Sequence, residues 1–292
     1  MTWCAGCTRT SASRNSPNSS GSETAVNAPV LPVRAEAGST LVEPVLAVQG
    51  LTKAFAGTGI LRGVDFALAP GQSTALIGAN GSGKSTLLRC LVRLVEPTSG
   101  GVLMLGQDVG ALSPRALRRF RARVGIVWQK HNLVPRLSAL SNVIHGAQAR
   151  MSGPRVWTQA LAPAQVRAEA MACLARVGLA DRALARVDSL SGGQSQRVAI
   201  ARMLMQRPEF ILADEPDASL DPQTGQEVME LLLGLVRQDG LSLLVISHRL
   251  EHTLAFSDRI LGLAQGRIAL DMPTPAASAG ELRRFFDHEA AA

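Results

Sequence analysis

The stretch "STALIGANGSGKSTLLRCLVRLV", residues 73–95, decides the fold of this chain. Its apolar start predicts a buried strand over 73–78, and apolar residues at helical spacing predict an amphipathic helix over 85–95. The loop between them satisfies the pattern G-x-x-x-x-G-K-[ST] at Gly78, Gly83, Lys84 and Ser85. Because this pattern binds phosphate when a strand precedes it and a helix follows it, the segment predicts a nucleotide-binding loop.

Each residue type in this loop has a task in holding phosphate. Glycines let backbone N–H groups wrap the phosphates, and the helix N-terminus adds its positive dipole. We expect Lys84 to reach the β and γ phosphates, the Ser85 hydroxyl to bind Mg²⁺, and Thr86 to donate to the α phosphate. The predicted nucleotide-binding residues are Gly78, Ala79, Asn80, Gly81, Ser82, Gly83, Lys84, Ser85 and Thr86.

An acidic pair ends another apolar run, "FILADEP", residues 210–216. A magnesium nucleotide needs a carboxylate at a strand end, and Asp214 supplies one. Because neighbouring side chains diverge in an extended segment, Asp214 can face the metal while Glu215 addresses the attacking water as general base. Such a pair is common at strand ends by itself, but beside the phosphate loop it predicts hydrolysis of the nucleotide.

Strands and helices alternate along the rest of the chain, which predicts a parallel α/β core. From about residue 130 to 190 the apolar spacing is mainly helical, so we expect a helical insertion in that core. A Gly-containing turn joins the first two short strands. The other predicted strands are 45–51, 65–69, 210–214 and 241–247, and the other predicted helices are 163–178, 225–238 and 281–290.

The composition indicates a folded protein with a basic surface. Its 292 residues are 46% hydrophobic, and the formal net charge of +7 makes anionic partners worth considering. We interpret the arginine run "PRALRRFRAR" (114–123) as a solvated helix face, because a chain with no Tyr and 3% aromatic residues is poorly equipped to stack on bases. No apolar run reaches the roughly 18 residues of a membrane-spanning helix, so we expect only peripheral membrane contact.

The first 44 residues differ from the rest. They are rich in Ser, Asn, Pro, Gly and Ala, and they lack both hydrophobic periodicity and the apolar region of a signal peptide, so we expect a disordered extension over 1–44. Cys4 and Cys7 have redox or metal spacing, but no second pair accompanies them, and we interpret the spacing as coincidence. Cys90 and Cys173 lie in apolar helical patterns and are interpreted as core residues.

A second glycine-rich loop, "SLSGGQSQR" (189–197), has no lysine. The ordered set "GANGSGKST", "VGIVWQ", "LSGGQSQRVAIAR", "FILADEP", "SLDP" and "ISH" resembles the ATP-binding subunit of an ATP-binding cassette (ABC) transporter over about 45–271. The resemblance implies an α/β fold of the P-loop NTPase class and ABC type: a mixed sheet core, a small antiparallel β subdomain and an inserted α-helical subdomain. It implies an ATP-binding domain over 45–272, with its helical subdomain at about 130–200, and a short tail or helix over 273–292.

The resemblance also implies roles for the remaining motifs. Gln129 would sense the γ-phosphate and Mg²⁺, and His248 would contact the γ-phosphate, which makes both catalytic together with Glu215. Ser85, Asp214 and Gln129 would form the metal site. Four further residues would complete nucleotide binding from the N-terminus of a helix, where N–H groups bind a phosphate without a lysine; they are Ser191, Gly192, Gly193 and Gln194.

In this family the second loop faces the nucleotide of the opposite subunit. The resemblance therefore implies a homodimer that closes head to tail around two ATP molecules. Asp221 in "SLDP" would couple the two active sites, and Phe55 would stack on adenine. The other implied partners are integral membrane permease subunits and a periplasmic substrate-binding protein, with this chain peripheral at the cytoplasmic face of the inner membrane; nucleic acid is not expected.

Finer resemblance points to the cargo. The stretches "HNLVPRLSALSNV" (131–143) and "ADEPDASLDP" (213–222) are similar to phosphonate importer ATPases, so we expect uptake of phosphonates or a related oxyanion such as phosphite. An importer of polar amino acids is the nearest alternative. A soluble ABC ATPase acting on DNA or ribosomes and a P-loop kinase or GTPase are further alternatives, and "LSGGQ", "SLDP" and "ISH" count against the last.

Three stretches depart from the family pattern. Asp217 stands where an apolar residue is expected, two positions after Glu215. The sequence "ISHRLEHTLAFSDRI" (246–260) differs from the usual sequence after the histidine, and "VWQ" (127–129) replaces a form that contains Phe. These departures indicate a divergent member of the family.

Overall fold

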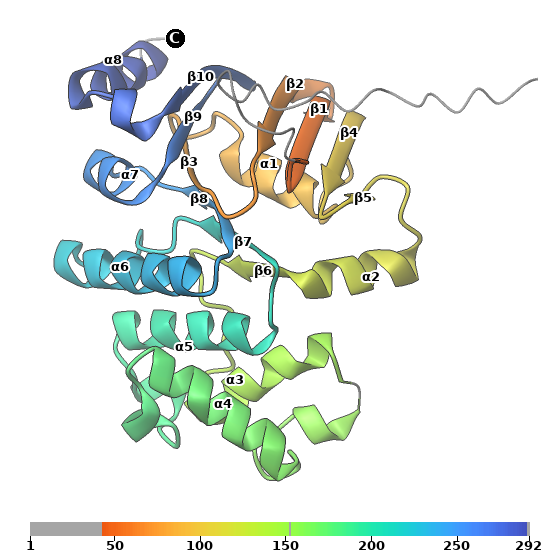
Figure 1. Ribbon diagram of the computed structural model, residues 1–292, viewed down its shortest axis with the longest axis vertical. Helices are drawn as coiled ribbons and strands as arrows, with labels where there is room; N and C mark the ends of the chain where they lie inside the picture. Colours follow the sequence, from red (N-terminus) through yellow and green to blue (C-terminus); the bar gives the residue numbers. More distant parts are fainter. Residues whose placement is uncertain (1–42, 152, 291–292) are drawn as a thin grey trace, which may run out of the picture. The chain divides into compact units, whose positions relative to one another are not determined.

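The computed structural model describes residues 43–151 and 153–290 of the chain. Its larger sheet has the strand order β10-β9-β3-β8-β7-β6 (Figure 1). All neighbours from β9 to β6 are parallel, and β10 pairs antiparallel with β9 at one edge. The predicted core is confirmed, and the antiparallel edge makes the sheet mixed. Its strands are β3 (Ser73–Ile77), β6 (Val124–Val127), β7 (Phe210–Asp214), β8 (Ser242–Ile246), β9 (Arg259–Ala264) and β10 (Arg267–Pro273).

A second sheet, of order β2-β1-β4-β5, is antiparallel throughout, as the family resemblance implies. The first two strands are longer than the predicted 45–51 and 65–69. Their pairing continues to the partners Phe55 and Thr58, through a part of the hairpin where most side chains are at least partly exposed and no apolar run marks a strand. The strands are β1 (Leu46–Phe55), β2 (Thr58–Leu68), β4 (Ser99–Met104) and β5 (Gln107–Asp108).

The helix after the phosphate loop is shorter than predicted. Helix α1 spans Lys84–Leu91 instead of 85–95. Arg93 has a left-handed backbone with φ 53°, and its guanidinium donates to three carbonyl oxygens between residues 109 and 112, at 2.8 to 3.0 Å. These acceptors lie far along the chain, so the apolar spacing around the helix does not reveal where it ends.

The arginine run forms helix α2 (Pro114–Arg123), which begins after the N-cap Ser113. Leu117 and Phe120 are its buried residues, and its arginines are exposed or half-buried. One of them, Arg123, forms a bidentate pair with Glu209 at 2.6 and 2.7 Å, which joins α2 to the start of β7. The arginine face therefore has a structural use on the sheet as well as contact with solvent.

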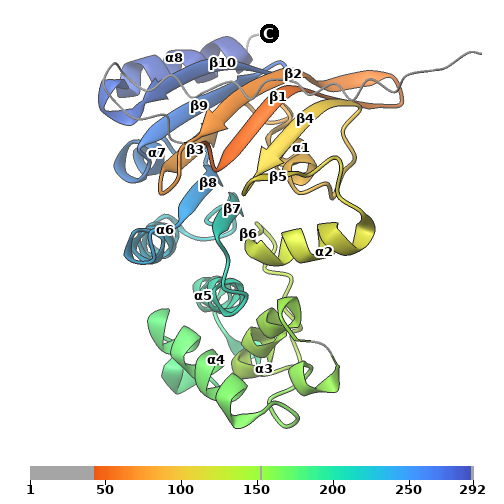
Figure 2. The same ribbon diagram turned by 45° about the vertical axis from the view of Figure 1, so that its right-hand side comes forward.

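Three helices pack together on the side of β6 and β7 away from α1, as both views show (Figures 1 and 2). They are α3 (Ala139–Ile144), α4 (Ala164–Arg176) and α5 (Gly192–Met205). Cys173 in α4 and Cys90 in α1 are buried, as interpreted from the sequence, and burial raises the pKa of both thiols to about 11. Short 3-10 helices occupy His145–Ala149 (η1), Pro154–Val156, Ala180–Arg182, Val187–Ser189 and Thr274–Ala276.

The remaining helices belong to the part of the chain that follows β7. They are α6 (Pro222–Gln238), α7 (Leu250–Phe256) and α8 (Ala279–Ala290), and Leu282 of α8 is buried beside Ile77 and Ile260. Within residues 43–151 and 153–290, no helix has the length and hydropathy needed to cross a membrane. Cys4, Cys7 and nearly all of the predicted extension lie outside the described residues.

Candidate functional site

The phosphate loop runs from the end of β3 to the start of α1. Gly78 has φ 152°, and a Cβ atom at this position would lie 2.3 Å from the backbone oxygen of Leu263 in β9. Gly83 then precedes α1 with φ 105°. Only glycine permits both the close approach to the neighbouring strand and these backbone angles. The loop therefore turns tightly enough to leave the N–H groups at the start of α1 available to an anion.

Lys84 lies inside this loop. Its side chain is buried, and Nζ donates to the backbone oxygens of Gly78 and Ala79, both at 2.9 Å. The Ser82 hydroxyl is buried there without a hydrogen-bond partner. An orphaned hydroxyl beside an ammonium group and a helix N-terminus suits a ligand that carries several acceptor oxygens, such as a polyphosphate.

Ser85 and Asp214 meet across the sheet. The Ser85 hydroxyl donates to Oδ1 of Asp214 at 3.0 Å, which joins the start of α1 to the end of β7. Burial raises the pKa of Asp214, the hydrogen bond from Ser85 opposes that rise, and the nearby Glu215 charge adds to it. A hydroxyl and a carboxylate are hard oxygen ligands, so this pair fits Mg²⁺, which takes few protein ligands beside water and phosphate. The described residues contain no cluster of three or more His, Cys, Asp or Glu that could hold a metal.

Glu215 and His248 form a second pair next to it. Nε2 of His248 lies 2.5 Å from Oε1 of Glu215. They meet because β7 and β8 are parallel neighbours, so the residues that follow them leave the same edge of the sheet. Glu215 has the left-handed φ of 48°, which is rare for a non-glycine residue and gives its side chain a direction different from that of Asp214. Glu215, the predicted base, is therefore held by His248, the residue predicted to contact the γ-phosphate.

The second glycine-rich loop begins helix α5. Ser191 is its N-cap and forms a capping box with Gln194, so both side chains bind backbone N–H groups of the first turn. Ser191 and Gly192 are exposed. Gly193 is buried, and a Cβ there would lie 2.3 Å from Cγ2 of Thr224, in the first turn of α6. The loop is thus packed against α6 on one side and open to solvent on the other.

Asp221 is the N-cap of helix α6. Its Oδ1 accepts from the Thr224 backbone N–H at 3.0 Å, and this bond lowers the pKa of the carboxyl. The loop "LSGGQ" and the loop "SLDP" therefore lie side by side at the N-termini of α5 and α6. Helix α5 contacts α3, α4, α6 and β6, whereas α1 contacts β2 and β7, so the two glycine-rich loops open helices with different neighbours.

Phe55 and Gln129 stand apart from these pairs. Phe55 at the end of β1 is 47% exposed, and Nζ of Lys53 lies 4.7 Å from its ring centroid. Gln129 is exposed, two residues after β6. Over the part of the chain that the structure describes, no hydrogen bond or ion pair joins Phe55, Gln129 or Ser191 to the residues of the two central pairs, Ser85, Asp214, Glu215 and His248.

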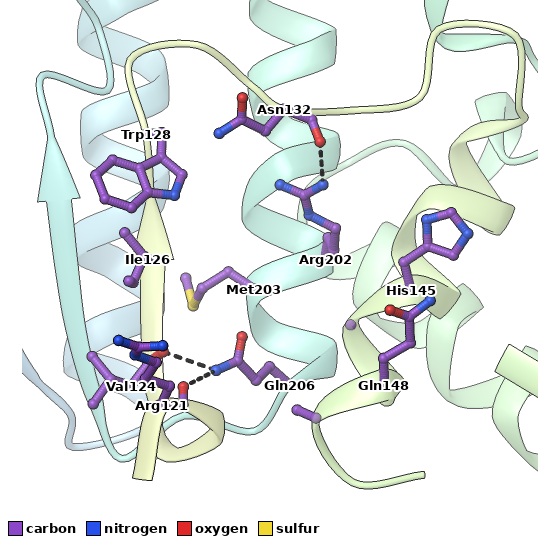
Figure 3. Close-up of a pocket in the computed structure, with 12 residues that line it drawn as sticks. Arg121, Val124, Ile126, Trp128, Asn132, His145, Gln148, Arg202, Met203 and Gln206 are labelled. Atoms are coloured by element: carbon purple, nitrogen blue, oxygen red, sulfur yellow. Dashed lines mark hydrogen bonds between the residues drawn. The ribbon is translucent and has the colours of Figure 1, made fainter. Parts of the chain in front are cut away.

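A pocket of about 420 Å³ lies beside the segment that contains Gln129 (Figure 3). Trp128 and Ile126 line one side, His145 and Gln148 line the other, and α5 forms its floor. Arg202 of α5 donates to the backbone oxygens of Asn132 and His131 at 2.6 and 3.0 Å, and thereby holds the start of 131–143 over the pocket. No sequence motif predicted this pocket; the single arginine inside the apolar stretch "VAIARMLM" was the available signal.

Comparison with known proteins agrees with this geometry. The profile described as "ABC transporter" matches residues 61–218. A phosphonates import ATP-binding protein of Nitratidesulfovibrio vulgaris is 43% identical over 84% of this chain and 92% of its own length. A phosphite import ATP-binding protein of Stutzerimonas stutzeri is 44% identical over 84% and 88%. The dimeric post-hydrolysis state of an ATP-binding cassette bound to ADP and Pi matches with TM-score 0.69 and 32% identity, covering 78% of this chain and 98% of that one.

Proposed function

This chain belongs to the ABC transporter family, and we propose that it is the subunit that hydrolyses ATP to drive import of phosphonates or a related phosphorus oxyanion. One observation carries the enzymatic part: the Ser85–Asp214 pair and the Glu215–His248 pair lie at the end of the same strand, β7 and its continuation. This places two oxygen ligands next to a base. The proposed ATP-binding domain spans 45–272, with a helical subdomain at about 130–200.

We infer that the phosphate loop holds the triphosphate of ATP. Lys84 exchanges its contacts with two loop carbonyls for phosphate oxygens, and Ser82 gains a partner for its orphaned hydroxyl. Ser85, Asp214 and Gln129 would hold Mg²⁺, which when bound neutralises charge on the phosphates. Phe55 would stack on adenine through the ring face that Lys53 leaves open.

Glu215 takes the role of general base. His248 occupies its Oε1, which leaves Oε2 to accept a proton from the attacking water. The same hydrogen bond fixes the rotation of the carboxylate, so that Oε2 faces one direction. His248 is therefore proposed to orient Glu215 as well as to contact the γ-phosphate.

The nucleotide site is completed by a second copy of the chain. The exposed N-terminus of α5 at Ser191 and Gly192 offers the Gly192 N–H and the positive end of the helix dipole to a phosphate held by the partner's phosphate loop. Asp221 lies beside that face and would meet the partner at the same interface. ATP then joins two subunits, and its hydrolysis releases them.

The pocket in Figure 3 is the proposed docking place of the membrane permease. Trp128 lines it and directly precedes Gln129, so contact with the permease and occupancy of the nucleotide site can influence each other. We further propose a periplasmic substrate-binding protein in the complex and a position of this chain at the cytoplasmic face of the inner membrane.

The enzymatic proposal is tested with Glu215→Gln. The purified variant is expected to bind ATP as the wild type does and to lose hydrolysis by about 100-fold or more, because an amide cannot accept the proton. Nucleotide titration and phosphate release measure the two properties separately. Hydrolysis at more than a tenth of the wild-type rate would remove Glu215 as the principal base.

The cargo is tested by growth of a strain of the source organism that lacks this gene. We expect it to fail on methylphosphonate or phosphite as sole phosphorus source, to grow on phosphate, and to recover with wild-type protein but not with Glu215→Gln. Normal growth on both compounds, in a strain without a second importer, would contradict the phosphorus cargo. An amino-acid uptake defect in the same strain would support the nearest alternative.

A further inference from the structure

Two stretches that depart from the family pattern meet in the structure. Asp217, the unexpected carboxylate, is 4% exposed. Its Oδ2 lies 3.0 Å from Nδ1 of His252 and 3.4 Å from Nε of Arg249, and both partners belong to the divergent segment 246–260. A buried carboxylate without a counter-charge is strongly unfavourable, so the Arg249 guanidinium explains how Asp217 can occupy an apolar position, with the His252 ring packed against the carboxylate.

Arg249 extends this contact to the loop that ends at Asp221. Its guanidinium also points at the backbone oxygens of Leu220 and Pro222, at 3.5 and 3.4 Å, which lie on either side of Asp221. Its backbone follows His248 directly. One side chain therefore contacts Asp217 and both neighbours of Asp221, and it belongs to the residue next to His248.

The loop between Glu215 and Asp221 is itself compact. The Ala218 N–H donates to the backbone oxygen of Glu215 at 3.2 Å, and the Leu220 N–H donates to the backbone oxygen of Asp217 at 3.1 Å. Because these two turns overlap, the backbone joins Asp221 closely to Asp217, and the ion pair joins Asp217 to Arg249.

We propose that Asp217 is a positioning residue, which through Arg249 and His252 holds His248 against Glu215 and couples that pair to Asp221. This rests on the proposed function, in which Glu215 is the base and Asp221 meets the second subunit. Binding of the second subunit at Asp221 would then change the position of His248 by way of Arg249, although Asp217 itself does not contact ATP.

The test uses Asp217→Asn, Arg249→Gln and the double variant in the full chain. Matched controls are Asp239→Asn and Arg176→Gln, which break an ion pair at the C-terminal end of α6 where Nη2 of Arg176 donates to both carboxylate oxygens of Asp239, each at 2.8 Å. Each Asp217 or Arg249 variant is expected to lose about tenfold in kcat with KM for ATP changed less than twofold, and the double variant should lose no more than the worse single one. The controls keep wild-type kcat.

Three results overturn the proposal: kcat within twofold of wild type in either single variant, additive losses in the double variant, or a kcat loss matched by an equal loss of folded protein in thermal melts. Arg249 is partly exposed, so Arg249→Gln remains informative if Asp217→Asn folds poorly. Glu215→Gln is measured alongside. If it keeps more than a tenth of the wild-type rate, Glu215 is not the principal base and the premise of the positioning role fails; if it is inactive while Asp217→Asn is normal, only the positioning role fails.

Discussion

Nε2 of His248 lies 2.5 Å from Oε1 of Glu215, although the two residues are 33 positions apart in the chain. The contact exists because β7 and β8 are parallel neighbours with Asp214 opposite Ile246, so the residues that follow the two strands leave the same edge of the sheet. Because His248 orients Glu215, a substitution of His248 should disable the base while the Glu215 carboxylate remains.

His248→Ala is expected to lower kcat for ATP hydrolysis by about 100-fold and to change ATP affinity by less than about threefold, because Glu215 keeps its charge but loses its fixed direction. Steady-state phosphate release and equilibrium nucleotide binding measure the two quantities. A large loss of affinity with normal kcat would assign His248 to binding alone.

The second glycine-rich loop is predicted to act on the partner's nucleotide. Ser191→Arg and Lys84→Ala should each abolish hydrolysis as homodimers, the first by blocking the loop and the second by removing the phosphate ligand. Mixing them yields heterodimers with one intact composite site, so activity should return, to at most about a quarter of wild type for random pairing. No recovery at any mixing ratio, with heterodimers demonstrated, would contradict action in trans.

Asp214→Asn is predicted to raise the melting temperature in the absence of nucleotide and Mg²⁺. Burial raises the pKa of Asp214 in the folded state, so the folded chain binds this proton more tightly than the unfolded chain does. At neutral pH the ionised carboxylate therefore opposes folding, and the amide removes that opposition while it can still accept from Ser85.

The direction of the effect of Asp214→Asn on stability can be checked by varying the pH and by adding ligand. The difference in melting temperature between Asp214→Asn and the wild type should narrow as pH falls through the raised pKa of Asp214, since the wild-type carboxyl then takes up its proton. Adding Mg²⁺ to ATP should raise the melting temperature of the wild type. The same addition should raise the melting temperature of the variant much less, because the variant lacks the Asp214 carboxylate. A variant that melts below wild type in every condition would show that the charge itself stabilises the fold.

Gly78→Ala is predicted to destabilise the protein more than Gly81→Ala. Both positions have positive φ, 152° and 86°, so both variants carry backbone strain of about 1 kcal/mol or more. Only the new Cβ at Gly78 would also strike the Leu263 oxygen, at 2.3 Å, whereas nothing lies within 4 Å at Gly81. Denaturant unfolding compares the two, and equal losses would exclude the close approach to β9 as the reason for glycine.

Much of the site could be predicted because its parts are local. The phosphate loop, the acidic pair after an apolar run and the capped start at Ser191 each depend on residues within one turn or strand, and their spacing carries the chemistry. The α/β alternation likewise follows from periodicity along the chain. Helix α1 shows the limit of such reasoning, since it ends at Leu91, just before Arg93, whose side chain donates to carbonyls more than fifteen positions away.

The sequence alone thus determined the loop chemistry, the order of elements and the family resemblance. Only the tertiary structure decided which residues touch: Ser85 with Asp214, Glu215 with His248, Asp217 with Arg249 and His252. The physical reason is the strand order β3-β8-β7, which places the ends of three distant segments at one edge. Local apolar spacing specifies each strand, but the order in which strands pair depends on the packing of the whole sheet.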